Sequence, residues 1–277
     1  MRTTSEAEIE YHYHTGNDFH ALRLDPRMVY SAALWTSEPQ SLEEAQVAKL
    51  RFHADAAGAR PGARILDVGC GWGAPLRFLV EERDVAEAVG LTLSPARKAH
   101  FEAGPPLARA RMTIASWQDD DDPQPFDGID SIGAFEHFGR HDHSPDERLA
   151  VYARFFDFCR RRLVRGGKLS LQTIAYGRIR KLAPFLRERI WRESELPTAH
   201  EVLEAACRGF EPERLLNHRL DYARTLRAWE ARLSAARARA EALAGPAKVA
   251  TTCAISTRPP PASRKALQLL RIAFRRC

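Results

Sequence analysis

The chain lacks any long hydrophobic run. Hydrophobic residues make up 44% of its 277 residues. Even so, it contains no stretch of the roughly 18 apolar residues that a membrane-spanning helix needs. Residues 1–10 are polar and lack the apolar segment of a secretory signal peptide. We therefore expect a cytoplasmic protein that folds as one large domain, or as one domain with an insertion.

Cysteine is scarce, and charge of one sign does not dominate. The five cysteines are scattered without metal-binding spacing, so reduced thiols are expected. The acidic run 119–122 and the run His141-Asp142-His143 lie in polar loops, where adjacent residues rarely converge on one ion, so no metal is expected. Lys+Arg 42 against Asp+Glu 36 leaves a net charge of +6, which selects no class of partner. The basic run 160–162 ends a helical pattern, where cations meet the negative end of the helix dipole, and requires no nucleic acid.

The most informative segment that is present is RILDVGCGWG, residues 64–73. Its apolar residues predict a buried strand. Glycines at 69, 71 and 73 let the backbone turn tightly and approach a ligand at the start of the next helix. This spacing differs from the G-x-G-x-x-G dinucleotide fingerprint. We therefore expect this turn to bind an adenine-nucleotide-like cofactor, but not in the manner of a dinucleotide-binding site.

Apolar runs alternate with helical patterns from residue 60 to residue 175. This order predicts an α/β fold with a doubly wound, mostly parallel sheet. The expected strands are Arg64–Val68, Ala86–Leu91, Arg111–Ala115, Gly128–Ala134 and Lys168–Ala175. The expected helices include Ala74–Glu82, Pro95–Glu102 and Pro145–Val164, with a stop at Arg165-Gly166-Gly167.

The remaining third of the chain has weaker patterns. Residues 176–196 lack the sheet rhythm and are expected to form a lid or substrate-covering insertion. Helices are expected at Ala199–Phe210 and Asp221–Leu243, with a possible strand at Phe210–Leu220. Residues 244–263 are expected to be a loop or partly disordered. In the last segment, Arg264–Arg276, Leu267, Leu270 and Phe274 share one helical face, which predicts a helix that caps the core or contacts a lipid surface as a peripheral membrane element.

Seven short motifs then allow a family to be named. They are YHYHTGNDF (11–19), MVYS (28–31), LEEAQ (42–46), DVGCGWG (67–73), GLTLS (90–94), SIGAFEHFG (131–139) and DYARTLRAW (221–229). In this order the chain resembles the cyclopropane fatty acid synthase family of S-adenosylmethionine (SAM) methyltransferases, which includes the mycolic acid cyclopropane synthases. The resemblance covers about residues 11 to 243 and implies a sheet of the class I SAM-dependent methyltransferase type.

The resemblance and the patterns together suggest four parts. Residues 1–58 would be an N-terminal helical cap that closes over cofactor and substrate, and residues 59–175 would be the SAM-binding Rossmann-like core. A substrate-covering insertion and later core elements would occupy 176–243. Residues 244–277 would be a poorly defined C-terminal segment.

The resemblance also implies which residues bind SAM. Tyr30 and Ser31 would close over its methionine end, and the floor would consist of Asp67, Gly69, Cys70 and Gly71. Thr92 and Leu93 would lie by the ribose and adenosine, and Arg97 stands where the family often has a ribose-binding glutamine. Trp117 would stack on the adenine, with Gln118 beside it and Ile132 against the ring system.

The catalytic residues depart from the family pattern. The lipid cyclopropane synthases hold a bicarbonate ion as the base with a Cys, a Glu, a His and a Tyr. Glu136 and Tyr222 match this set, whereas Ala32 replaces the cysteine and Gln172 replaces the histidine. An anion would lose two partners, so we expect bicarbonate to be bound weakly or not at all. Glu136, or a water held by Glu136, Gln172 and Tyr222, is then the expected base.

This chemistry predicts one-carbon transfer to an unsaturated acceptor. Methyl transfer to an alkene leaves a carbocation, and loss of a proton then gives a cyclopropane or a methylated product. Aromatic faces can stabilise the cation, and the candidates are Phe135, Tyr176, Tyr222 and Trp229.

Three functions remain open. The main hypothesis is C-methylation or cyclopropanation of a small molecule, such as a specialised metabolite. The alternative is a cyclopropane fatty acid synthase acting on lipid acyl chains. The intact motifs argue against a third hypothesis, a non-catalytic protein with this fold. A long apolar tunnel would favour lipid, and a short cavity with polar groups would favour a compact metabolite.

Overall fold

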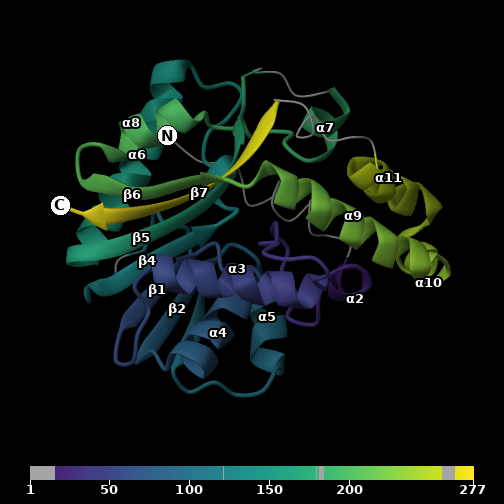
Figure 1. The fold of residues 1–277 in the computed structure, drawn as a ribbon, viewed down its shortest axis with the longest axis horizontal. Helices are drawn as coiled ribbons and strands as arrows, with labels where there is room; N and C mark the ends of the chain where they lie inside the picture. The colour runs from purple at the N-terminus through teal and green to yellow at the C-terminus, as the bar shows by residue number, and fades with distance from the viewer. Residues whose placement is uncertain (1–15, 121, 179, 181–183, 258–265) are drawn as a thin grey trace.

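A seven-stranded sheet forms the centre of the molecule (Figure 1). The computed structural model describes residues 16–277 except 121, 179, 181–183 and 258–265. The strand order is β3-β2-β1-β4-β5-β7-β6. Pairs among the first five strands are parallel, and β7 pairs antiparallel with β5 and β6. This is the mostly parallel, class I methyltransferase type of sheet that was expected.

The strands expected between residues 64 and 175 are present, with ends displaced by a few residues. The strands are β1 Arg64–Val68, β2 Glu87–Thr92, β3 Ala110–Ile114, β4 Phe126–Ile132, β5 Leu163–Tyr176, β6 Phe210–Asn217 and β7 Leu267–Arg276. The helix stop expected at 165–167 is wrong. The preceding helix ends at Arg162, and Gly166 lies inside β5, where the register against β4 is irregular.

Helices cover both faces of the sheet. They are α2 Gly16–Ala21, α3 Leu42–Ala56, α4 Ala74–Arg83, α5 Pro95–Ala103, a 3₁₀ turn η1 Phe135–His137, α6 Pro145–Arg162, α7 Pro184–Arg189, α8 Ala199–Ala206, α9 Arg219–Ala235, α10 Arg237–Ala244 and α11 Pro246–Thr257. Successive residues of β1 enter different cores. Ile65 packs with α3 and α4, whereas Leu66 and Val68 pack with α6 and α8. Burial on both faces explains why Ile65, Leu66 and Val68 are all apolar.

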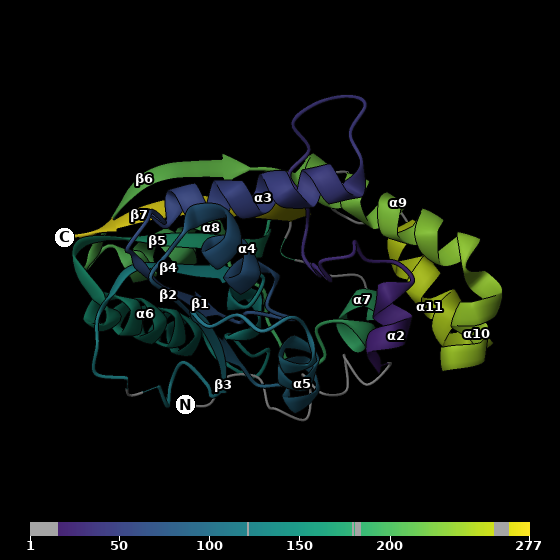
Figure 2. The ribbon, with the colours of Figure 1, turned by 90° about the horizontal axis from the view of Figure 1, so that it is seen from below.

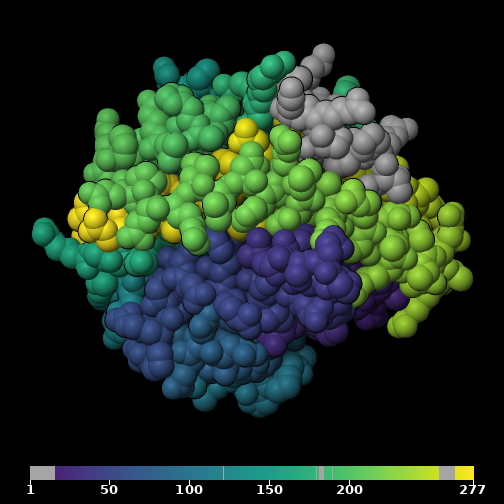
Figure 3. Space-filling model, viewed as in Figure 1, coloured from purple at the N-terminus to yellow at the C-terminus, as the bar shows by residue number. Residues whose placement is uncertain are grey.

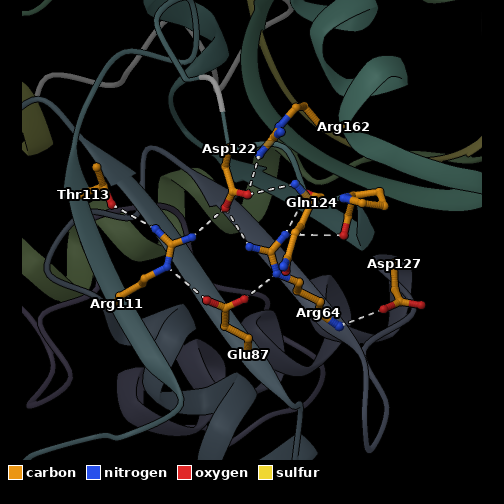
Figure 4. Close-up of polar contacts among 9 residues, drawn as sticks. Arg64, Glu87, Arg111, Thr113, Asp122, Gln124, Asp127 and Arg162 are labelled. Atoms are coloured by element: carbon orange, nitrogen blue, oxygen red, sulfur yellow. Dashed lines mark hydrogen bonds and ion pairs between the residues drawn. The ribbon is translucent and has the colours of Figure 1, made fainter.

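Charged residues join the amino ends of β1, β2 and β3 (Figure 4). The Asp122 carboxylate lies 2.7 Å from an Arg64 Nη and 2.6 Å from an Arg111 Nη. Glu87 on β2 also pairs with both arginines, on β1 and β3. Asp122 belongs to the acidic run 119–122, and its ion pairs with these arginines give it a structural role.

The segment expected to be a loop at 244–263 is mostly a helix. Residues 246–257 form α11, which packs against α9 and α10, whereas residues 258–263 lie outside the described part of the chain. The expectation was wrong because small residues such as Ala and Thr carry little periodicity. Packing against α9 and α10, rather than an apolar stripe in the sequence, stabilises this helix.

The helix expected at 264–276 is also wrong. Residues 267–276 form β7, the strand between β5 and β6. Leu267, Leu270 and Phe274 are at most 1% exposed, so they are buried in the core of the sheet and cannot contact a lipid surface. Residues buried on both faces of a strand also satisfy a helical spacing of three or four, which produced the error.

The burial of β7 predicts a large loss of stability in Phe274→Ala. Phe274 is fully buried, with ring centroids 5.4 Å from Phe156 and 6.1 Å from Phe210. We expect a loss of about 3–5 kcal/mol in the free energy of unfolding, measured by urea denaturation. The matched control is Arg275→Ala, at an exposed neighbouring position. Equal stability of the two variants would contradict the assignment of this strand.

Helices from distant parts of the sequence gather beyond one end of the sheet. Figures 1 and 2 show α2 beside α9, α10 and α11, with the C-terminus at the opposite end, and Figure 3 shows the N-terminal surface meeting that of α9. The Trp35 indole N–H donates to Thr225 on α9 over 3.1 Å, and Arg232 donates to the Leu24 carbonyl over 3.0 Å. Among the described residues, no helix is both long and apolar enough to cross a membrane.

Candidate active site

Two adjoining hollows lie where β1 and β4 end. We call the smaller one the glycine-turn hollow; its lining includes Tyr30, Ser31, Lys49, Asp67, Gly69, Cys70, Gly71, Trp72, Arg97 and Ile132. We call the larger one, of about 390 Å³, the large cavity; its lining includes Tyr30, Ala32, Glu136, Gln172, Trp191, Tyr222 and Trp229. Tyr30, Ser31 and Gly133 line both. A molecule in one hollow therefore lies next to a molecule in the other.

The backbone of the glycine turn requires glycine for two different reasons. A Cβ atom at Gly69 would lie 2.6 Å from the Ala134 side chain, and one at Gly73 would lie 2.3 Å from Phe101. Gly71 has φ of +55° but no atom within 4 Å of a Cβ position. Gly71 lines the hollow, so the free space beside it is part of the hollow. A side chain at this position would project into that space.

A buried pair of aspartates includes Asp67, which lines the glycine-turn hollow. Asp67 on β1 pairs in register with Asp130 on β4, and neither is more than 2% exposed. Burial raises the pKa of Asp67 well above its usual range, and the Asp130 charge adds to the effect. Burial also raises the pKa of Asp130, to about 6. Apart from the neighbouring Asp130 carboxyl, neither Asp67 oxygen has a hydrogen-bond partner, so Asp67 can accept hydrogen bonds from a ligand in the hollow.

Lys49 was missed by the sequence analysis. Its ammonium is 1% exposed and donates to the Ser31 hydroxyl over 2.7 Å, while burial lowers its pKa to about 7. From the same helix, Gln46 donates to the Ser31 carbonyl over 3.0 Å. Helix α3 therefore holds the backbone of Ser31 at the junction of the two hollows. The available signal was a lysine at a position where the helical period demands an apolar residue.

The structure brings most of the expected cofactor residues together. Lining the glycine-turn hollow are Tyr30, Ser31, Asp67, Gly69, Cys70, Gly71, Arg97 and Ile132. Thr92 and Leu93 follow at the end of β2, and Gln118 is exposed. Trp117 packs in the core, with ring centroids 5.4 Å from Phe138 and 5.5 Å from Phe155. These last four residues are outside the lining, and their contacts with the adenosine part remain predictions.

Glu136 is buried in the wall of the large cavity. It lies in η1 directly after β4, is 4% exposed, and accepts a 3.0 Å hydrogen bond from the Thr173 hydroxyl. Burial raises its pKa to about 7, although the Thr173 bond opposes the shift. His137 lines the same cavity, with Nδ1 3.1 Å from the Ser194 hydroxyl. A carboxyl group with this pKa can hold or take up a proton near neutral pH.

Arg271 fixes the two positions at which this chain departs from the bicarbonate set. Its Nε donates to Gln172 Oε1 over 2.8 Å, and one Nη donates to the carbonyls of Ala32 and Ala33 over 3.0 and 2.9 Å. The other Nη contacts His218 and Asp221. Every N–H of this fully buried guanidinium thus has an acceptor, which leaves none for an anion. The helix expected at 264–276 would have contained Arg271, which instead lies on β7.

The aromatic candidates divide into two groups. Tyr222 and Trp229 line the large cavity, and burial raises the pKa of Tyr222, which keeps its phenol protonated. Phe135 is fully buried in the core, stacked 4.7 Å from Tyr152, so its assignment to the acceptor was wrong. Tyr176 is outside the lining of the cavity. Additional aromatic walls come from Phe19, Tyr30 and Trp191.

Known proteins resemble this chain in sequence and in fold. A family model described as mycolic acid cyclopropane synthetase matches residues 1–252. Cyclopropane mycolic acid synthase 1 of Mycobacterium tuberculosis is 36% identical over 259 residues, which cover 86% of this chain and 85% of that protein. The structure of cyclopropane synthase MmaA2 from the same organism has a TM-score of 0.87 at 30% identity, with 99% of each chain covered. Mycolic acid cyclopropane synthase CmaA1, complexed with S-adenosylhomocysteine (SAH) and CTAB, has a TM-score of 0.87 at 31% identity, also with 99% of each chain covered.

Proposed function

Because the chain belongs to the mycolic acid cyclopropane synthetase family, we propose that it transfers a methyl or methylene group to a carbon of an unsaturated small-molecule acceptor. The protein is a SAM-dependent enzyme of one-carbon transfer. The observation that carries the finer proposal is the buried Glu136 carboxyl in a cavity that adjoins the glycine-turn hollow.

The residues of the glycine-turn hollow suit SAM. The Asp67 carboxyl lines the hollow and can accept hydrogen bonds from a ligand ammonium, and the open side of Gly71 leaves room for the ligand. Arg97 lies over Trp72, 4.3 Å from the ring centroid, and both side chains line the hollow.

When bound, SAM supplies an electrophilic methyl group. The residues of the chain position the acceptor and exclude water, so that the acceptor carbon approaches in line with the departing sulfur. The faces of Tyr222 and Trp229 stabilise the positive charge that develops on the acceptor. Glu136 then takes the proton whose loss closes a ring or restores a double bond.

The composition of the cavity favours a compact acceptor. The cavity volume of about 390 Å³ lies at the low end for small-molecule sites, and charged side chains of Arg23 and Lys248 line it with the aromatic groups. A lipid acyl chain is the second candidate. The names of the relatives favour it, and Ile174, Ile190, Ile255 and Leu269 supply apolar lining.

One experiment tests the reaction and separates the two acceptors. The purified enzyme is incubated with SAM that carries a trideuterated methyl group, together with a panel of unsaturated lipids and small aromatic or alkenyl metabolites. Mass spectrometry of the products identifies the acceptor class. A product with all three deuterons indicates methylation, and loss of one deuteron indicates ring closure. Absence of any labelled product across both classes would contradict the proposal.

Activity is expected to be insensitive to bicarbonate. Ala32 offers no polar side-chain group, Gln172 cannot become cationic, and Arg271 has no N–H to spare. Rates measured in degassed buffer, with and without added bicarbonate, should agree within about twofold. A several-fold increase on adding bicarbonate would show that the base mechanism of the lipid enzymes survives in this protein.

A further inference from the structure

Arg23 is a buried cation that lines the large cavity without a carboxylate partner. Arg23 is 6% exposed, and its Nε has no hydrogen-bond partner. One Nη is 3.4 Å from His20 Nδ1, which is a weak contact. Among the described residues, no acidic side chain forms an ion pair with Arg23. A guanidinium removed from water in this way is unfavourable unless an anion reaches it.

Aromatic faces hold Arg23 in place. The guanidinium carbon lies 4.6 Å from the centroid of Tyr30 and 5.7 Å from that of Trp229, and both rings line the cavity. Cation–π contacts offset part of the desolvation cost but leave the N–H groups able to donate in the plane of the guanidinium. The side chain is therefore fixed in orientation and retains donors for a ligand.

A second cation lines the same cavity from a distant part of the chain. Lys248 on α11 contributes its side chain to the lining, and no ion pair connects it with an acid of the described chain. Burial lowers the pKa of His20, a further lining residue, to about 2, and the charges of Arg23, Arg97 and Lys248 act in the same direction. Positive potential thus accumulates where α2 and α11 meet the cavity.

We propose that the acceptor carries an anionic group, a carboxylate or a phosphate, that binds Arg23 and Lys248 while its unsaturated carbon reaches the reacting centre. The proposal rests on the proposed function and specifies the substrate class. A planar guanidinium can bind both oxygens of such a group, so it fixes the orientation of the acceptor relative to Glu136. An acceptor without an anion would leave the desolvation cost of Arg23 unmet.

Matched pairs of small probes test this assignment by calorimetry on the SAH-saturated protein. One pair is trans-cinnamate and cinnamyl alcohol, and the other is phenyl phosphate and phenol. The acid of at least one pair should bind about tenfold or more tightly than its neutral partner, and the pair that responds distinguishes carboxylate from phosphate. Failure of both acids to bind at millimolar concentration would overturn the proposal.

Variants show whether Arg23 is responsible. Arg23→Gln should abolish the preference for the acid, Lys248→Gln should reduce it, and Arg23→Lys should restore part of it. The control is Arg27→Gln, since Arg27 forms a surface ion pair with Glu82 and is outside the cavity lining. SAH affinity is measured in every protein, and unchanged affinity also shows that the variant has folded.

The same measurements separate failure of this inference from failure of the proposed function. If the unaltered protein does not bind SAH, the proposed function fails. If SAH binds but the acids show no preference, or Arg23→Gln retains that preference, the anionic acceptor is rejected. If Arg23→Gln weakens SAH binding instead, Arg23 serves the carboxylate of the cofactor and this inference is overturned.

Discussion

Replacement of Gly71 by leucine is expected to abolish SAM binding. Gly71 lies in the lining of the glycine-turn hollow, and nothing occupies the space within 4 Å of its Cβ position. A leucine side chain would fill the volume that the ligand needs. We expect affinity for SAM and SAH, measured by calorimetry, to fall by about 10³ or more, equivalent to about 4 kcal/mol.

A matched control separates this effect from backbone strain. Gly62 also has a positive φ, of +79°, with nothing near its Cβ position, but it is exposed in the turn before β1. Gly62→Leu should therefore lose a similar amount of stability and keep normal SAH affinity. Unchanged SAM affinity in a folded Gly71→Leu protein would reject this hollow as the cofactor site.

Glu136→Gln is expected to reduce turnover by about 10² or more while SAH affinity stays nearly unchanged. Glutamine keeps the shape of the side chain and removes its basicity. The base acts as a carboxylate, and burial raises its pKa to about 7. Turnover of the unaltered enzyme should therefore rise with pH through neutrality, and that rise should be absent in the variant. The control is Glu102→Gln, at an exposed position on α5.

The same substitution should increase stability at high pH. Between the ordinary pKa of 4.5 and the folded-state value of about 7, the folded protein retains a proton that the unfolded chain has lost. Stability contributed by Glu136 therefore declines as pH rises through this window. Glu136→Gln removes this decline, so near pH 8 the variant should gain up to roughly 3 kcal/mol in the free energy of unfolding. Near-normal turnover of the variant would assign the base elsewhere, and equal stability near pH 8 would contradict the raised pKa of Glu136.

Local sequence was sufficient for the sheet core and for the glycine turn. The strand 64–68, its three glycines and the following helix are specified by neighbouring residues: apolar side chains for a strand buried on both faces, and glycines where φ is positive. Helix starts were similarly local. Ser144 and Glu147 form a capping box that begins α6 at the expected residue.

The chemical environment of the site required the tertiary structure. Arg271 and Ala32 are 239 residues apart in the chain, yet a hydrogen bond joins them because β7 is inserted between β5 and β6. No local pattern reports such a pairing, and a strand buried on both faces resembles a helix in its apolar spacing.

The sequence alone thus determined the fold class, the family resemblance and the candidacy of Glu136, since these depend on residue types in order along the chain. Only the tertiary structure decided that Gln172 is held by Arg271, and that Arg23 and Lys248 line one cavity. Burial and charge at a site depend on elements far apart in sequence, and the same side chain is solvated or desolvated according to what packs against it.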